Sequence, residues 1–225
     1  MQKIAVIVAG GTGQRMGTST PKQFLLLQGK PLLYYTVQRF LDTWSDLKII
    51  LVLPEMHIKA GNEIVADLHA GTRVSITKGG DSRYQSVKNG LALIQEQSVV
   101  FVHDGVRCFV TSDLIKRCYE QALEKGTAIP AIAATDSIRI VQENHHEVID
   151  RNRVRIIQTP QTFLSEILIP AFDKPYEERF TDEATVVEAS GKEIYLIEGE
   201  HTNIKITRPV DLLIAEQMIT SHRIT

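Results

Sequence analysis

Short apolar runs alternate with helical patterns along the chain, and this alternation limits the possible fold more than any other feature. The runs are rich in β-branched residues and cover residues 4–9, 48–53, 98–103 and 128–133. Such runs suit strands that are buried on both faces of a sheet. Between them, apolar residues recur every three or four positions in residues 32–41, 57–68, 82–95 and 112–124. The order predicts an α/β fold with a mainly parallel sheet flanked by helices.

The composition favours one globular domain over residues 1–225. No Ser-, Pro- or charge-rich linker interrupts the 225 residues, of which 43% are hydrophobic and 23% are charged. The formal net charge of −2 gives no basic field for binding nucleic acid. A local cluster of cations must therefore hold any anionic substrate.

The cysteines and the apolar segments bear on the location of the protein. Cys108 and Cys118 have no partners at metal-ligand spacing, which is typical of a reducing compartment and excludes a structural zinc site. The N-terminal apolar run is too short for a signal peptide, and no segment approaches the roughly 20 apolar residues that span a bilayer. We expect a cytoplasmic protein without a membrane partner.

Residues 136–150 break the α/β rhythm. Two β-rich pieces, 137–141 and 147–149, flank a polar tip at 143–146, which predicts a β-hairpin. A lone two-stranded hairpin is marginal in water, so this one should pack on its own domain or on a second subunit. Residues 207–221 predict a terminal helix with Pro209 in its first turn.

The glycine-rich loop after the first apolar run favours phosphate binding. Gly11, Gly13 and Gly17 are spaced one residue wider than the dinucleotide fingerprint, and no acidic residue follows about 20 positions on. A GxxxxGK[ST] loop is also absent. Arg15 and Lys22 follow the glycines closely, and fixed cations there could stabilise the charge that develops in a transfer reaction at phosphorus. The alternative is a plain strand-to-helix turn with solvated charges.

Two later loops repeat the pattern of a strand end followed by polar residues. In GGDSRYQS, residues 79–86, Asp81 or Ser82 could cap a helix, contact a ligand or do both. In VHDGVR, residues 102–107, Asp104 could bind Mg²⁺ together with substrate phosphates, or cap the following turn. These two residue patterns leave the alternatives open.

Six ordered segments together resemble the 2-C-methyl-D-erythritol 4-phosphate cytidylyltransferases of the non-mevalonate isoprenoid pathway. They are AGGTGQRMG with PKQF, GGDSRYQSVKNGL, VHDGVR, DRNRVRIIQTPQTF, FTDEATVVEASG and NIKITRPVDL, and they cover nearly the whole chain. The resemblance implies a Rossmann-like nucleotidyltransferase fold with a protruding hairpin arm. It also implies an enzyme that joins CTP, as a substrate, to a sugar-alcohol phosphate with Mg²⁺ present and releases pyrophosphate.

The resemblance further assigns roles to single residues. Those that would bind CTP are Ala9, Gly10, Gly11, Thr12, Gly13, Gly80, Asp81, Ser86, Asp104 and Gly105. Arg15 and Lys22 would stabilise charge around the α-phosphorus, and Asp104 would bind the metal. The residues that would hold the acceptor are Ser137, Arg151, Thr159, Thr181 and Lys205, with Arg151 and Lys205 also catalytic. The resemblance also implies a homodimer, in which the 136–150 arm would carry Arg151 into the site of the neighbouring subunit.

The late residues have simpler explanations as well. Arg151 could be an exposed charge, Thr181 the N-cap of a helix, and Lys205 an outward residue of a strand. Small departures from the family pattern fall near the site, at Gly10, Gly105-Val106, Cys108 and Ser137.

Two rival functions remain. One is the related ribitol 5-phosphate cytidylyltransferase reaction, which shares the CTP half of the site. The other is a non-catalytic nucleotide-binding regulator, against which the joint presence of Arg15, Lys22, Asp104, Arg151 and Lys205 argues.

Overall fold

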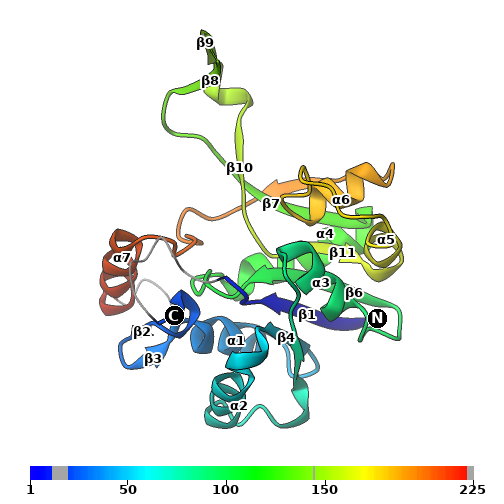
Figure 1. Ribbon diagram of the computed structural model, residues 1–225, viewed down its shortest axis with the longest axis vertical. Helices are drawn as coiled ribbons and strands as arrows, with labels where there is room; N and C mark the ends of the chain where they lie inside the picture. The colour runs from blue at the N-terminus through cyan, green and yellow to red at the C-terminus, as the bar shows by residue number, and fades with distance from the viewer. Residues whose placement is uncertain (12–19, 144, 222–225) are drawn as a thin grey trace.

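The computed structural model describes residues 1–11, 20–143 and 145–221, and a central sheet organises them (Figure 1). Among these residues, eight strands form this sheet in the order β10-β7-β11-β6-β1-β4-β5, with β12 beside β7. The strands are β1 (Gln2–Val8), β4 (Lys48–Leu53), β5 (Val74–Lys78), β6 (Ser98–Asp104), β7 (Thr127–Ala133), β10 (Arg155–Ile157), β11 (Gln161–Leu164) and β12 (Leu196–Glu198).

The sheet is mixed but mostly parallel, as the alternation of strands and helices predicted. β1 pairs in parallel with β4 and β6, β4 with β5, and β12 with β7. β11 runs antiparallel between β6 and β7, and β10 runs antiparallel to β7. The parallel half places the carboxyl ends of β1, β4 and β6 along one edge, where ligands bind in open α/β sheets.

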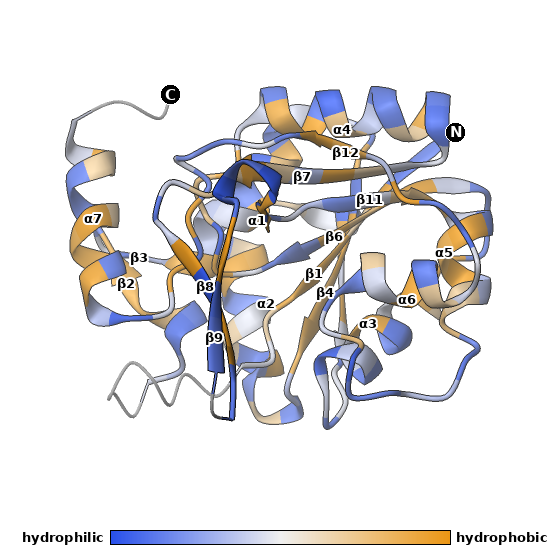
Figure 2. Ribbon diagram, turned by 90° about the horizontal axis from the view of Figure 1, so that it is seen from above, coloured by the Kyte–Doolittle hydropathy of each residue, from blue (hydrophilic) through white to orange (hydrophobic). Residues whose placement is uncertain are grey.

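Helices cover both faces of the sheet (Figures 1 and 2). They are α1 (Leu32–Thr43), α2 (Ile58–Asp67), α3 (Arg83–Leu91), α4 (Ser112–Lys125), α5 (Ser165–Ala171), α6 (Glu183–Ala189) and α7 (Pro209–Thr220). Ala5 and Ile7 of β1 join a core with α1 and α4, whereas Val6 joins a second core with α3, α5 and α6. Burial of β1 on both faces explains why its sequence is continuously apolar.

Local signals start and end the helices. At α4, Thr111 Oγ1 accepts a hydrogen bond from Leu114 N at 3.0 Å, and the helix ends at Gly126, whose φ is +85°. A hydroxyl N-cap and a left-handed glycine are the usual terminators of a helix. Pro209 stands at the first position of α7, as predicted.

Short pieces complete the chain. They are the strands β2 (Leu26–Leu27) and β3 (Lys30–Pro31) and the 3-10 turns η2 (Lys22–Phe24), η3 (Glu55–His57), η4 (Gly71–Arg73) and η5 (Arg151–Arg153). α7 packs near β2 in a third, smaller core that includes Leu27 and Ile206. In the part of the chain that is described, no helix has the length and apolar character needed to cross a membrane.

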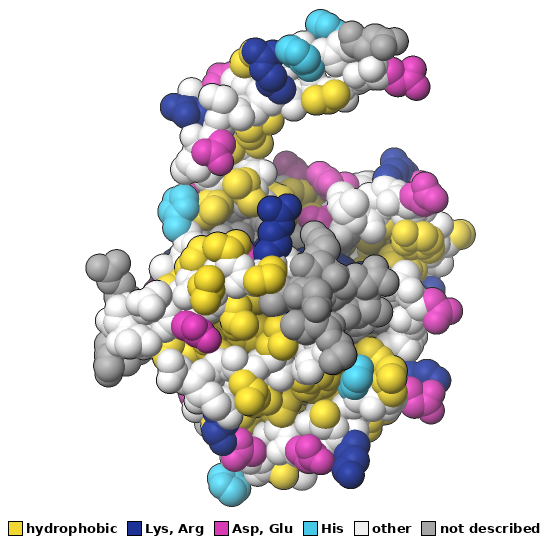
Figure 3. Space-filling model, turned by 60° about the vertical axis from the view of Figure 1, so that its left-hand side comes forward, with side chains coloured by type: hydrophobic (Ala, Val, Ile, Leu, Met, Phe, Trp, Pro, Cys, Tyr) yellow, Lys and Arg dark blue, Asp and Glu magenta, His cyan; other side chains and the backbone are white. Residues whose placement is uncertain are grey.

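The predicted hairpin is present and forms a protruding arm. β8 (Ile138–Gln142) and β9 (His145–Ile149) pair antiparallel in a sheet of their own. Figures 1 and 3 show the arm standing away from the body, and Val141 and Val148 are 77% and 68% exposed. The hairpin therefore does not fold back on its own domain. Packing on a second subunit stays a prediction.

Candidate active site

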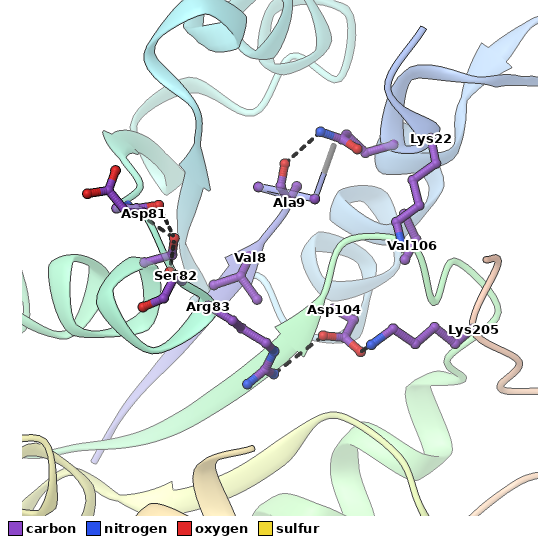
Figure 4. A pocket seen from close by; sticks show the side chains of 14 residues that line it. Val8, Ala9, Lys22, Asp81, Ser82, Arg83, Asp104, Val106 and Lys205 are labelled. Carbon is purple, nitrogen blue, oxygen red and sulfur yellow. Dashed lines mark hydrogen bonds and ion pairs between the residues drawn. The ribbon is translucent and has the colours of Figure 1, made fainter. Parts of the chain in front are cut away.

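A cavity of about 300 Å³ opens beside the carboxyl ends of β1 and β6 and the start of α3 (Figure 4). The predicted site residues that line it are Ala9, Gly10, Gly11, Lys22, Gly80, Asp81, Ser86, Asp104 and Lys205. The lining residues that were not among the predicted site residues are Val8, Gln23, Ser82, Arg83 and Val106. Segments that are far apart in the chain thus form one pocket.

The first wall of this pocket is the described part of the glycine loop. Gln23 Nε2 donates a hydrogen bond to Ala9 O at 2.7 Å, which ties η2 to the end of β1. A Cβ at Gly11 would lie 3.4 Å from Cε of Lys22, so the Lys22 stem runs close to the loop backbone. Thr12, Gly13 and Arg15 lie outside the described residues.

The second wall is the loop before α3, and here the structure separates the two polar residues. Ser82 is the N-cap, since its Oγ accepts a hydrogen bond from Gln85 N at 3.0 Å. Ser86 Oγ accepts from Gly80 N at 3.1 Å and donates to Ser82 O at 2.9 Å. Asp81 is exposed and lines the pocket. Ser82 therefore caps α3, while Asp81 lines the pocket without capping the helix.

Asp104 ends β6 at the floor of the pocket, and three cations surround its carboxylate. Lys205 Nζ lies 2.9 Å from Oδ2, Arg107 Nε lies 3.5 Å from Oδ2, and Arg83 Nη2 lies 3.3 Å from Oδ1. Burial alone would raise the pKa of Asp104, but these cations hold the pKa well below its usual range. The carboxylate is therefore ionised at neutral pH.

Arg83 connects this carboxylate to a second, deeper one. Its Nη1 donates to Oε1 of Glu183, and its Nη2 donates to Oε2 of Glu183 at 3.0 Å and to Oδ1 of Asp104 at 3.3 Å. Glu183 is 1% exposed at the start of α6, and burial raises its pKa, which the charge of Arg83 opposes. Arg83 and Glu183 are 100 positions apart. No spacing pattern within one sequence could have linked them.

A chain of buried hydrogen bonds links Asp104 to Thr159 and His103. His103 Nε2 lies 3.1 Å from Arg107 O, which can only accept, so this nitrogen carries the proton. Burial lowers the pKa of His103 to about 4, and the neutral ring accepts at Nδ1 from the Thr159 hydroxyl at 3.0 Å. Thr159 Oγ1 in turn accepts from Asp104 N at 3.1 Å. Thr159 therefore contacts the backbone of Asp104, and its contact with a substrate stays a prediction.

The remaining predicted residues do not line the pocket of their own chain. Gly105 is buried next to Asp104, with its N–H bonded to Val8 O at 2.9 Å. Ser137 and Thr181 are exposed, and Arg151 at the base of the arm donates to Thr135 O at 2.8 Å. The N-cap of α6 is Asp182, so the simpler explanation of Thr181 as a cap is wrong.

Lys205 comes from the loop before α7, so it is not the outward strand residue that the simpler explanation supposed. Its ammonium reaches Asp104 from the side opposite Arg83 (Figure 4). Among the described residues, no three or more His, Cys, Asp or Glu side chains lie together where they could hold a metal ion. A pocket with glycine backbones, cations and one central carboxylate at the carboxyl edge of a parallel sheet defines the class of nucleotide-binding α/β proteins.

Comparison with known proteins narrows this class to one family. The family model described as 2-C-methyl-D-erythritol 4-phosphate cytidylyltransferase (IspD) matches residues 3–221. A protein of that name from Phocaeicola vulgatus is 43% identical over 219 residues, which are 97% of this chain and 100% of that protein. The chain belongs to this family of nucleotidyltransferases, which confirms the resemblance found in its motifs.

Solved structures agree on the fold. The 2-C-methyl-D-erythritol 4-phosphate cytidylyltransferase of Francisella tularensis is 30% identical with a TM-score of 0.80, covering 96% of this chain and 99% of that one. The 4-diphosphocytidyl-2C-methyl-D-erythritol synthase of Anaerococcus prevotii has a TM-score of 0.84 at 24% identity, covering 97% of this chain and 96% of that one. The arrangement of the strands and helices is thus that of known cytidylyltransferases.

Proposed function

We propose that this chain transfers the cytidylyl group of CTP to 2-C-methyl-D-erythritol 4-phosphate in isoprenoid precursor biosynthesis. The products are 4-diphosphocytidyl-2-C-methyl-D-erythritol and pyrophosphate. The observation that carries the proposal is the pocket in which Arg83 and Lys205 contact the ionised Asp104 and Lys22 lines the same cavity, in a chain that belongs to this family. Such a pocket suits two phosphate-bearing substrates, which repel each other unless cations surround them.

The reaction is an in-line displacement at phosphorus. An acceptor phosphate oxygen forms a bond to the α-phosphorus of CTP, and the bond from that phosphorus to the bridging oxygen of the β-phosphate breaks. The electron pair leaves with pyrophosphate. The acceptor phosphate is already ionised near neutral pH, so no general base is required. The work of the protein is positioning and charge stabilisation.

The pocket supports a role for each wall. Gly10 and Gly11 would let the backbone approach CTP closely, and Gly80, Asp81 and Ser86 line the part of the pocket where we place the cytidine end. Lys22, with Arg15 from the glycine loop, would stabilise the charge around the α-phosphorus. Lys205 would hold the acceptor phosphate. The assignments of Thr12, Gly13, Gly105, Ser137, Arg151, Thr159 and Thr181 stay part of the proposal.

The proposal includes Mg²⁺ with Asp104 as its one protein ligand, although both carboxylate oxygens of Asp104 contact cations in the described residues. This ion commonly takes one or two carboxylates and completes its shell with water and substrate phosphates. Asp104 presents one ionised carboxylate to the cavity, and Asp81 lines the same cavity. Mg²⁺ held there with CTP would supply neutralisation of phosphate charge.

The arm supports a homodimer with shared sites. Its strands pair only with each other in the described sheets, and its side chains Ile140, Val141 and Val148 are exposed. Arg151, at the base of the arm, does not line the pocket of its own chain. A second subunit that receives the arm would cover these side chains and gain Arg151.

A cytoplasmic location also belongs to the proposal, and the two free, buried thiols suit a reducing compartment.

The experiment that tests the proposed function compares two acceptors. Release of pyrophosphate from CTP and Mg²⁺ is measured with 2-C-methyl-D-erythritol 4-phosphate and with ribitol 5-phosphate. We expect a higher kcat/KM with the methylerythritol acceptor. A higher value with ribitol phosphate would assign the chain to the rival cytidylyltransferase reaction. CTP binding without pyrophosphate release from either acceptor would indicate a regulator.

A further inference from the structure

Gln23 is a buried amide in the wall of the pocket, and the proposed reaction assigns it no role. It is the middle residue of η2, follows Lys22 directly and is 1% exposed. Its Nε2 donates a hydrogen bond to Ala9 O at 2.7 Å. Its Oε1 is also buried, and no group in the described part of the chain donates to it. A buried acceptor without a partner is unfavourable, so packing alone does not explain an amide at this position.

The bond from Gln23 joins the two ends of the segment that carries the glycine loop. The chain leaves the sheet at Ala9, whose N–H donates to Val52 O of β4 at 3.0 Å, and Gln23 lies 14 positions further on. Ala9 is thus held by β4 through its N–H and by Gln23 through its carbonyl. Figure 4 shows this second bond as the dashed line at Ala9. The end of β1 and the turn η2 are therefore fixed relative to each other.

Lys22 takes its position from the same turn. Its carbonyl accepts from Leu25 N at 3.1 Å, and Phe24 N donates to Pro21 O at 2.9 Å, so its backbone is held in η2. Its side chain runs close to the other end of the loop, since a Cβ at Gly11 would lie 3.4 Å from Lys22 Cε. A shift of η2 away from β1 would move this ammonium relative to phosphates bound at Gly11.

We propose that Gln23 is a positioning residue for Lys22. Its amide holds η2 against the end of β1 and so fixes the Lys22 ammonium beside the bound phosphates of CTP. The inference rests on the role of Lys22 in the proposed function and adds a residue that acts through that side chain. A purely structural Gln23 would stabilise the fold without changing the rate of the transfer step.

The first test separates turnover from binding and from stability. Gln23→Met keeps the length of the side chain but cannot donate to Ala9 O. Pyrophosphate release at saturating CTP, Mg²⁺ and 2-C-methyl-D-erythritol 4-phosphate should show kcat lowered about tenfold or more, because small misplacements of a reacting group cost this much. The dissociation constant of CTP should change less than about threefold, since the loss falls on the transition state. Gln121→Met, the matched control, loses amide bonds to Thr127 O and Tyr195 O away from the pocket, so it should lower the melting temperature but keep kcat.

The second test restores the bond by pH. In Gln23→Glu only the protonated carboxyl can donate to Ala9 O, and burial favours the protonated form. The ratio of its kcat to that of wild type should therefore fall as the pH rises from 6 to 9, because an ionised carboxylate repels the Ala9 carbonyl. The same ratio for Gln23→Met should stay constant, since methionine has no group that titrates.

A double-mutant cycle tests whether Gln23 acts through Lys22. In the Lys22→Ala background there is no ammonium to position, so adding Gln23→Met should lower kcat by less than about threefold. An equal loss in both backgrounds would overturn the inference, because Gln23 would then act independently of Lys22. Thermal melts establish which variants are folded.

Failure of this inference is distinguishable from failure of the proposed function. Wild-type protein that releases no pyrophosphate, or Lys22→Ala that keeps full turnover, would overturn the role of Lys22 and this inference with it. Impaired Lys22→Ala together with wild-type kcat in folded Gln23→Met would overturn this inference alone. Where Gln23→Met does not fold, a kcat ratio for Gln23→Glu that is independent of pH would overturn it.

Discussion

Single side chains carry the charge on which the pocket depends. Lys22 enters it from η2, directly after the glycine loop, and Lys205 enters from the loop before α7. Asp104 lies between Arg83 and Lys205 and stays ionised because of them. Fixed cations of this kind act most strongly where negative charge increases during the reaction.

Replacing Lys22 tests its part in this charge balance. We expect Lys22→Ala to lower kcat by about a hundredfold or more, with a smaller effect on CTP binding, because one transition-state contact is lost. Steady-state kinetics and equilibrium binding of CTP measure the two effects. Lys30→Ala, an exposed lysine paired with Asp67, is the control and should keep kcat. Unchanged turnover in Lys22→Ala would contradict a role for Lys22 in the transition state and would leave the loop with a role in CTP binding only.

His103 makes stability depend on pH. Its pKa is about 4 in the folded protein against 6.5 for the free side chain, because burial disfavours the charged ring. Between these pH values the unfolded chain binds a proton that the folded chain does not. The free energy of unfolding should therefore fall as the pH falls from 6.5 toward 4, by up to about 1.4 kcal/mol per unit from this group.

Urea unfolding at pH 7 to 5, in the presence of a chelator, measures this slope. We expect His103→Gln to be less stable at pH 7 but to lose the part of the slope that His103 contributes. His145→Gln changes an exposed histidine of the arm and should keep the wild-type slope. Parallel pH profiles for wild type and His103→Gln would contradict the buried neutral ring.

At the scale of elements, the loop that carries Lys205 is irregular but firmly tied. Asn203 is fully buried, and its Nδ2 donates to Thr159 O at 2.8 Å. Its own carbonyl accepts from Arg107 Nη1 at 2.8 Å, while Gln158 Nε2 donates to Glu200 O at 2.7 Å. These bonds anchor the loop beside the end of β10, so they set where Lys205 meets Asp104.

Asn203→Ala should both destabilise the protein and misplace Lys205. Loss of the bond to Thr159 O leaves a buried carbonyl without this partner, which costs about 1–3 kcal/mol of unfolding free energy. We expect a lower melting temperature and a higher KM for the acceptor phosphate. Thr202→Ala, an exposed neighbour, should change neither quantity. A normal KM in a destabilised Asn203→Ala would show that the loop does not position Lys205.

The sequence predicted the elements with strong patterns and missed the short ones. β1, β4, β6 and β7, and the four helices between residues 32 and 125, lie close to their predicted bounds because each buries a long apolar run or face. β10, β11 and β12 have only three or four residues each, too few to show a period. Helix α3 ends at Leu91, short of the predicted Gln95.

Some residues of the candidate site could likewise be predicted from the sequence, and others could not. Lys22, Gly80 and Asp104 lie in loops that were singled out because each loop follows a strand, and strand ends meet at one edge of the sheet. Lys205 was assigned only through the family resemblance. Arg83 and Glu183 received no role, because their pairing depends on how α3 and α6 pack together. Long-range charge pairs of this kind leave no local spacing in a sequence.

At the scale of the whole molecule, the proposed dimer makes each pocket depend on two chains. Lys22 and Arg151 would then act on the same substrate from different subunits. Lys22→Ala and Arg151→Ala should each be nearly inactive alone. Refolded together, about half of the dimers are mixed, and each mixed dimer has one site with both side chains intact, so about a quarter of wild-type activity should return.

The matched control mixes Lys22→Ala with Asp104→Asn. Both residues line the pocket of one chain, so every site in the mixed dimers carries one defect and activity should stay low. Light scattering measures the mass of the particles in each sample. A monomeric mass, or no recovery on mixing Lys22→Ala with Arg151→Ala, would contradict the shared site.

The most direct test of cytidylyl transfer follows the phosphorus atom that changes partner. CTP labelled at the α-phosphorus is incubated with 2-C-methyl-D-erythritol 4-phosphate, Mg²⁺ and the protein, and the products are separated by chromatography. The proposed reaction places the label in the cytidine diphosphate alcohol and releases unlabelled pyrophosphate in equal amount. Label in free CMP, or label that enters no acceptor-dependent product, would contradict it.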